Sequence, residues 1–176
     1  AFRAWNYAAV RGFPKREAGE DFYLLNKLAK TGRIRCPDTS PISIRGRFSD
    51  RVPFGTGAAL NELGLDRRAL EGFRLYSPEV FEGLRATLKG LTTFVQQRQL
   101  QSFHQSICEE LEERAEPLLG VLDKMGFSKA LEEALRQAPD ADRLEIRLKT
   151  WFDSFKTMRF LHQLRDEAHP SIPWLE

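Results

Sequence analysis

The sequence predicts a mainly helical α+β chain in which a short α/β segment precedes a helical bundle. Residues 1 to about 57 mix helical and extended patterns with Gly/Pro turns, whereas later residues repeat apolar side chains at helical spacing. In addition, 41% of the 176 residues are hydrophobic, which is enough to bury a core. We therefore expect two domains, 1–57 and 58–176.

The first domain is predicted to contain one clear helix. The chain opens at Ala1 within an amphipathic, helical stretch, and we expect a longer upstream part before it. A turn follows at 12–14, and then a helix over 19–32 with acids in its first turn and a glycine at its end. Two extended runs, 33–36 and 42–48, complete the α/β pattern. The predicted buried face of the helix comprises Phe22, Leu25, Leu28 and Ala29.

The second domain is predicted to be a bundle. Short helices are expected over 57–64 and 65–73, followed by longer amphipathic segments. Ser77 and Pro78 suit the start of the first long helix, and Pro117 should break the second near Ala115. The predicted buried stripes are Val80, Leu84, Leu88, Leu91 and Val95; Leu100, Phe103, Ile107, Leu111, Leu118, Leu122 and Met125; and Leu144, Leu148, Trp151, Phe155, Met158 and His162. Trp151, Phe152, Phe155 and Phe160 are expected in the core.

Composition and charge exclude several classes of protein. The 27 Lys and Arg residues nearly balance the 25 Asp and Glu residues. A net charge of +2 lacks the excess of positive charge that is typical of nucleic-acid-binding proteins. Cys36 and Cys108 lie far apart without CxxC spacing, which indicates a reducing compartment, so we expect a cytoplasmic protein. No stretch approaches the roughly 18 apolar residues of a membrane span. The sequence contains no evident Ser/His/Asp or Cys/His arrangement, so an independent hydrolase is not expected.

The run from Tyr7 to Ile34 has the strongest functional pattern. An aromatic and small-residue helix leads to Arg11-Gly12-Phe13, then to the acidic pair Glu20-Asp21, an amphipathic helix and a glycine before an extended run. This ordered set resembles the acceptor side of family-2 glycosyltransferases with a GT-A fold. The resemblance implies an inverting transferase that moves a sugar from a nucleotide-sugar donor to an acceptor hydroxyl.

Glycosyl transfer requires a base near the acceptor hydroxyl. A carboxylate within about 2.6–3.2 Å can take the hydroxyl proton, and a helix N-terminus favours the ionised carboxylate by about 0.3–1 kcal/mol. The resemblance assigns the role of base to Asp21 and a supporting, acceptor-orienting role to Glu20. The structural alternative is that Glu20 and Asp21 only begin a helix, because acids are common in the first turn.

A second candidate site lies in the run 44–57. Arg45, Arg47 and Arg51 alternate with small and polar residues, and Gly55 and Gly57 precede a predicted helix. Guanidinium groups and free N–H groups at a helix N-terminus both suit phosphate oxygens. We expect this run to neutralise the diphosphate leaving group. The alternative is that the arginines face solvent from an edge strand while the glycines form a turn.

Two departures from the family pattern concern the metal. Many metal-dependent members carry a histidine after the Glu-Asp helix, whereas this chain has Ser43, Arg45 and Arg47 there. The Asp-x-Asp of a nucleotide-binding βαβ region is also missing, so this chain alone is expected to bind no metal and to be inactive. Mg²⁺ or Mn²⁺ is expected only together with an upstream half. The Asp140-Ala141-Asp142 sequence is better explained as a helix cap.

Other polar clusters are weaker candidates. His104, Cys108 and Glu112 share a helix face and could approach a metal, but no fourth ligand is evident, and a half-buried His beside a core Cys is the better explanation. An acidic run is expected to be a solvated helix face, or else a docking surface for a basic partner; it comprises Glu109, Glu110, Glu112, Glu113 and Glu116. The alternative function for the whole chain is a non-enzymatic helical module for protein interaction or homo-oligomerisation.

Overall fold

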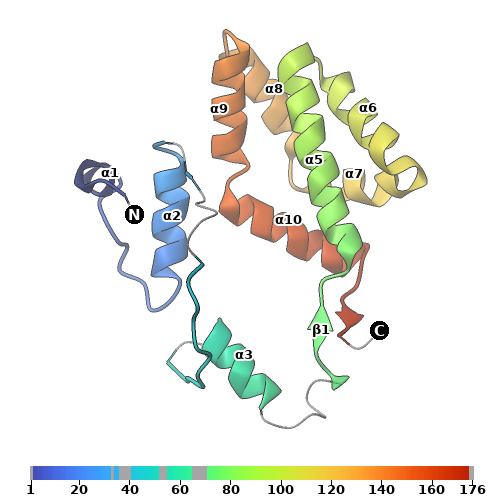
Figure 1. Ribbon diagram of the computed structural model, residues 1–176. Helices are drawn as coiled ribbons and strands as arrows, with labels where there is room; N and C mark the ends of the chain where they lie inside the picture. The colour runs from blue at the N-terminus through green and yellow to red at the C-terminus, as the bar shows by residue number, and fades with distance from the viewer. Residues whose placement is uncertain (1, 33, 36–40, 52–54, 65–70, 175–176) are drawn as a thin grey trace. The chain divides into compact units, whose positions relative to one another are not determined.

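The fold is known from a computed structural model that describes residues 2–32, 34–35, 41–51, 55–64 and 71–174. The chain is mainly helical with two short strands, which confirms the predicted fold class. It divides into two compact units, Ala1–Phe73 with Pro173–Glu176, and Arg74–Ile172 (Figure 1). The sequence placed the boundary at 57/58, whereas the unit boundary lies after Phe73. The helix that follows residue 55 belongs to the first unit, because its side chains hold the preceding loop.

The first unit contains α1 (Ala4–Ala9), α2 (Glu20–Ala29) and α3 (Thr56–Leu63). All three correspond to helices predicted from the sequence. The buried cluster of this unit consists of Val10, Leu24 and Leu28. Leu25 was expected on the buried face of α2, but its side chain is 53% exposed and Leu24 is buried in its place. Leu24 and Leu28 are four residues apart and so share the helix face that contacts Val10.

The predicted strand over 42–48 was wrong, because residues 41–50 form no strand. Ile34 and Arg35 of the other expected run also form no strand, while Arg33 and Cys36 lie outside the described residues. A strand needs a neighbour for its backbone groups, and no described segment pairs with either run. The observed strands are β1 (Arg74–Leu75) and β2 (Ile172–Pro173), which pair in a two-stranded sheet.

The second unit is a helical bundle in which α5 (Pro78–Gln97) contacts α6 (Leu100–Leu111), α9 (Ala141–Trp151) and α10 (Ser154–Glu167) (Figure 1). Between these lie η1 (Glu112–Arg114), α7 (Ala115–Lys124) and α8 (Phe127–Gln137). The predicted helix over 65–73 falls largely outside the described residues. The larger buried side chains of the bundle are Val80, Phe94, Phe103, Ile107, Leu118, Leu122, Phe127, Leu131, Leu144, Leu148, Phe152, Phe160 and Leu164.

Two helix boundaries in the bundle occur where the sequence supplies a proline or a cap. Pro117 has no N–H, and its ring conflicts with a continuous helix at the carbonyl of residue 113, which explains why η1 interrupts the helix between α6 and α7. Asp140 caps α9, where its carboxylate accepts a hydrogen bond of 2.8 Å from the Arg143 N–H. The predicted cap role of the Asp140-Ala141-Asp142 sequence is thereby confirmed.

The last predicted helix is in fact two helices. Asp153 caps α10 by accepting hydrogen bonds from the N–H groups of Phe155 and Lys156, and the chain turns between α9 and α10. This turn shifts the buried face after residue 152. Met158 and His162 were predicted to be buried but are exposed, whereas Phe160 and Leu164 are fully buried. Phe152 and Phe160 are in the core as predicted, and Trp151 packs against it.

The buried face of α5 is made largely of small residues. Val80, Gly83, Thr87, Gly90 and Phe94 lie on it, whereas Leu88 of the predicted stripe is 49% exposed. A Cβ atom on Gly83 would lie only 2.6 Å from Cδ2 of Leu164, which is fully buried. Small residues on α5 therefore allow the neighbouring helices to approach closely.

We expect the same substitution to have opposite effects at two helical glycines. Gly83→Ala should lower the free energy of unfolding by about 1 kcal/mol, because overpacking costs about 1–3 kcal/mol and exceeds the gain in helix propensity. Gly120→Ala on α7 should raise it by about 0.5–1 kcal/mol, since a Cβ there meets no atom within 4 Å. Urea denaturation followed by circular dichroism measures both changes. Equal stabilisation of the two variants would contradict the packing around Gly83.

Candidate functional site

The turn before the acidic pair is built around Tyr7. Gly12 has φ of 66°, and a Cβ at this position would lie 2.7 Å from atoms of the Tyr7 ring. Only glycine fits such a conformation this close to a ring. The Tyr7 hydroxyl accepts a hydrogen bond of 3.2 Å from the Phe13 N–H, and the two rings meet edge to face. The Arg11-Gly12-Phe13 sequence therefore forms the predicted turn, held by an aromatic side chain of α1.

Glu20 and Asp21 occupy the first turn of α2, as the sequence predicted. The helix starts after Gly19, whose left-handed φ of 71° reverses the chain direction. The Asp21 side chain is exposed, and its Oδ1 accepts a hydrogen bond of 2.7 Å from the Phe22 N–H. Within the described residues, neither acid forms an ion pair. A carboxylate that contacts solvent can be reached by an acceptor hydroxyl.

The second predicted site forms a hollow of about 250 Å³ in the first unit. We call it the arginine hollow. All five binding residues proposed from the sequence line it: Arg45, Arg47, Arg51, Gly55 and Gly57. Ile44, Gly46, Ser49 and Thr56 line it too, and sequence reasoning did not single these out. The available signal was that each of them lies next to, or within two residues of, one of the proposed binding residues in the sequence.

Three glycines give the arginine hollow its shape. Gly55 has φ of 95°, which side-chain-bearing residues rarely adopt, and it stands at the N-cap of α3. A Cβ on Gly57 would lie 2.7 Å from Ser49 Cβ, and one on Gly46 would lie 3.0 Å from Leu60. The loop can therefore pass directly against the first turn of α3.

Asn61 holds the same loop from one turn further along α3. Its Nδ2 donates a hydrogen bond of 3.0 Å to the Ser49 carbonyl and another to the Asp50 carboxylate. Asp50 is thus engaged by an amide rather than by an arginine. As a result, the loop carboxylate nearest to the arginines in sequence leaves their guanidinium groups available.

The electrostatics of the arginine hollow favour an anion. Arg45, Arg47 and Arg51 are exposed, and none of them is ion-paired in the described part of the chain. The N-cap residue Gly55 has no side chain to cap α3, and none of the described residues supplies a side-chain acceptor to the first-turn N–H groups. Guanidinium groups and a helix N-terminus both attract phosphate oxygens. Because its charged side chains are all cationic, the arginine hollow does not suit Mg²⁺ or Mn²⁺.

The two predicted sites are separate in the described contacts. No hydrogen bond or ion pair among the described residues joins Glu20 or Asp21 to the arginine hollow. The acids lie on α2 and the arginines in the loop before α3, within the same compact unit.

The remaining clusters considered from the sequence form no site among the described residues, although Cys108 is exposed rather than in the core as expected. Among the described residues, no group of three or more His, Cys, Asp or Glu side chains is placed to hold a metal ion. Glu112 has left-handed φ of 52° and lies in η1, beyond the end of α6, which carries His104 and the exposed Cys108. Glu110 accepts a hydrogen bond of 2.6 Å from Lys89, which lowers the pKa of the Glu110 carboxyl. The other acids of that run are exposed, as predicted for a solvated face.

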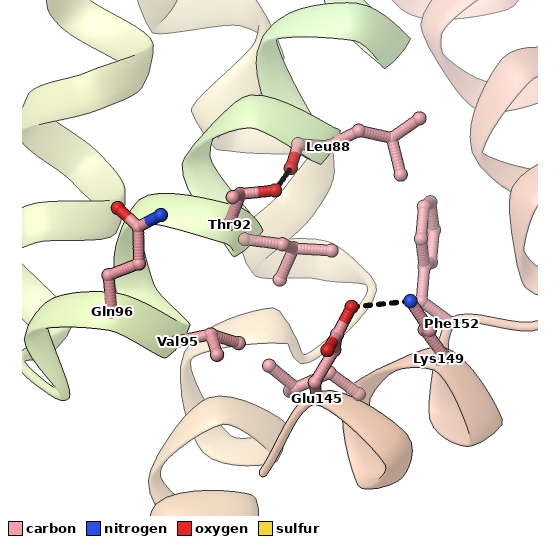
Figure 2. A pocket seen from close by; sticks show the side chains of 9 residues that line it. Leu88, Thr92, Val95, Gln96, Glu145, Lys149 and Phe152 are labelled. Carbon is pink, nitrogen blue, oxygen red and sulfur yellow. Dashed lines mark hydrogen bonds and ion pairs between the residues drawn. The ribbon is translucent and has the colours of Figure 1, made fainter. Parts of the chain in front are cut away.

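The second unit has a mainly apolar groove of about 350 Å³, which we call the bundle groove (Figure 2). Its apolar lining comes from Leu88, Leu91 and Val95 of α5, from Leu148 of α9 and from Phe152. Most of its polar groups are engaged: the Thr92 hydroxyl bonds to the Leu88 carbonyl and Glu145 pairs with Lys149, whereas Gln96 carries the remaining polar side chain of the lining (Figure 2). The bundle groove therefore offers apolar contact rather than catalytic groups.

Comparison of the chain with protein-family models, curated proteins and solved structures found no match. No helix in the described ranges is both long and apolar enough to cross a membrane. The functional interpretation therefore depends on the two sites in the first unit and on the bundle groove.

Proposed function

We propose that this chain is the acceptor-side portion of an inverting glycosyltransferase that works with a nucleotide-binding half. The observation that carries this proposal is the arginine hollow. Three guanidinium groups and a helix N-terminus meet there, none of them paired or capped by a described side chain, and this is the chemistry that a departing nucleoside diphosphate needs. The resemblance of the run 7–34 to family-2 enzymes gives the reaction class, and the cytoplasm, where nucleotide sugars and reduced cysteines coexist, is the proposed location.

Asp21 is the proposed base. During transfer, its carboxylate would remove the proton of the acceptor hydroxyl as that oxygen attacks the anomeric carbon, and the bond to the diphosphate breaks. Glu20 would orient the acceptor. Arg45, Arg47 and Arg51 would stabilise the negative charge that develops on the leaving diphosphate. Mg²⁺ or Mn²⁺, where required, would be held by the nucleotide-binding half.

Pyrophosphate should bind the arginine hollow of this chain. We expect Arg45→Ala and Arg47→Ala each to weaken pyrophosphate binding by about 10- to 100-fold, because a hydrogen bond to a charged group is worth about 1.5–3 kcal/mol. Isothermal titration calorimetry of the 176-residue chain measures the affinity. Binding should weaken as salt is added, since the interaction is between charges.

Arg35→Ala is the matched control for this experiment. Arg35 is exposed and does not line the arginine hollow, so its replacement should leave pyrophosphate affinity unchanged. An equal loss on Arg35→Ala would mean that pyrophosphate binds to general positive charge. Absence of binding to the unaltered chain at millimolar pyrophosphate would also contradict the proposal.

The bundle groove supports a second candidate function, that of a helical interaction module. Apolar grooves between helices receive the apolar face of an amphipathic partner helix. Leu88, at the groove, is 49% exposed, and Ile146 of α9 is 58% exposed. Light scattering after size-exclusion chromatography tests the homo-oligomeric form of this function. If the unaltered chain is a monomer, and Leu88→Glu has the same mass in solution, self-association through the bundle groove is excluded.

A further inference from the structure

Asp50 is an acid beside the arginine hollow that is not paired with an arginine. It is adjacent to Arg51 and three residues after Arg47 in the sequence. In the described part of the chain, its carboxylate is bonded to the side chain of Asn61 on α3 and forms no ion pair. Local sequence favours a different partner, because a carboxylate and a neighbouring guanidinium group can form a bidentate pair.

An adjacent arginine and aspartate do form such a pair elsewhere in this chain. Arg165 donates two hydrogen bonds to the carboxylate of Asp166, from Nε to Oδ1 at 2.6 Å and from Nη2 to Oδ2 at 3.0 Å. Asp166 is exposed, and so is Asp50, so contact with solvent alone does not keep neighbouring charges apart. The different behaviour of Asp50 therefore has its cause in the residues around it.

Asn61 is the residue that holds Asp50. Its amide NH₂ group has two hydrogen atoms, which suffice for the two acceptors that it meets, the Asp50 carboxylate and the Ser49 carbonyl at 3.0 Å. A hydrogen bond of 3.4 Å from the Arg51 N–H to Ser49 Oγ closes the turn between these residues. Because Asn61 stands on a helix, these contacts fix the Asp50 carboxylate against α3 rather than leave it to rotate toward the Arg51 guanidinium group.

We infer that Asp50 is an internal competitor for the anion of the arginine hollow, and that Asn61 is the positioning residue that keeps Asp50 away from Arg51. While Asn61 holds Asp50, the Arg51 guanidinium group is available to an anion. Once released, the carboxylate pairs with Arg51 as Asp166 pairs with Arg165, and the anion must displace it. The inference rests on the proposed function for the identity of the anion, whereas the control of Asp50 by Asn61 does not.

Asn61→Ala releases Asp50 without changing a residue that lines the arginine hollow. This variant of the 176-residue chain should bind pyrophosphate about 3- to 5-fold more weakly, because the anion must then displace an exposed carboxylate, which forms a pair of modest strength. Isothermal titration calorimetry measures the affinity. Asn6→Ala is the matched control, since Asn6 lies on α1 and does not line the arginine hollow, and its affinity should equal that of the unaltered chain.

A double variant distinguishes competition by Asp50 from a change in the shape of the loop. Asp50→Asn keeps the size of the side chain but removes the charge that pairs with Arg51. If Asn61 acts through Asp50, adding Asn61→Ala to Asp50→Asn should weaken pyrophosphate binding by less than about twofold. The full loss in this background would overturn the inference, because Asn61 would then act by shaping the loop through the Ser49 carbonyl.

The NMR signal of the Arg51 side chain gives a second readout that needs no anion. The Arg51 Nε–H should exchange with water more slowly in Asn61→Ala than in the unaltered chain, because a carboxylate then accepts a hydrogen bond from it. The difference should vanish in the double variant. Slower exchange with no pyrophosphate binding in any variant would support the control of Asp50 by Asn61 and contradict the diphosphate site. Pyrophosphate binding with neither affinity nor exchange changed in Asn61→Ala would support the diphosphate site and overturn the inference.

Discussion

Asp21→Asn is expected to lower the rate of glycosyl transfer by about 10²- to 10⁴-fold in an enzyme that contains this chain and a nucleotide-binding half. The amide has nearly the same shape as the carboxylate but does not accept the proton of the acceptor hydroxyl. The loss should appear in kcat, since donor binding uses other residues. Initial rates with saturating donor and acceptor measure it, and circular dichroism of the variant checks that folding is retained.

Glu17→Gln provides the control for Asp21→Asn. Glu17 is an exposed acid in the loop before α2, and its replacement removes the same charge four residues away. The transfer rate should stay near that of the unaltered enzyme. If Asp21→Asn retained full activity, or if Glu17→Gln lost as much, the assignment of Asp21 as the base would be wrong.

Phe160→Ala is expected to lower the free energy of unfolding by about 3–5 kcal/mol, which is the usual cost of removing a buried phenylalanine ring. Phe160 is fully buried and meets the Phe152 ring edge to face, with centroids 6.0 Å apart. Met158→Ala on the same helix should cost less than about 1 kcal/mol, because the Met158 side chain is 43% exposed. Urea denaturation monitored by circular dichroism compares the two variants.

The pair also distinguishes the observed bundle from the continuous helix predicted by the sequence. A helix running straight through residue 152 would bury Met158 on the stripe of Leu148. The losses of unfolding free energy in Phe160→Ala and Met158→Ala would then be similar in size, or Met158→Ala would lose more. A larger effect from Met158→Ala than from Phe160→Ala would contradict the turn at Asp153. That turn is therefore testable without a second structure.

Local signals in the sequence were sufficient for most of the helices and for the cap at Asp140, whereas Ser77 precedes α5 as predicted but makes no capping hydrogen bond with its side chain. Pro117 and Asp140 act through neighbouring backbone groups, so their effects could be predicted from nearby residues. The break at Asp153 was missed because the apolar pattern continues across it, and the cap becomes informative only when the following turn is known. Leu24 was missed because Leu24 and Leu25 are adjacent and only the position of Val10 distinguishes them.

The candidate site was predicted unevenly. The arginine hollow forms from residues 44–57, which are close in sequence, and all five residues proposed there line it. The strand over 42–48 was not found, because strand formation depends on a partner that is remote in sequence or on another polypeptide. Whether Asp21 works together with the arginine hollow depends on the bound substrate, which neither spacing nor periodicity specifies.

A crystal structure of the donor-binding enzyme with a nucleoside diphosphate is the most direct measurement of the central claim. The account predicts phosphate oxygens within hydrogen-bond distance of the Arg45 or Arg47 guanidinium groups and of the first-turn N–H groups of α3. A nucleoside diphosphate bound elsewhere, with solvent alone between these arginines and α3, would contradict it.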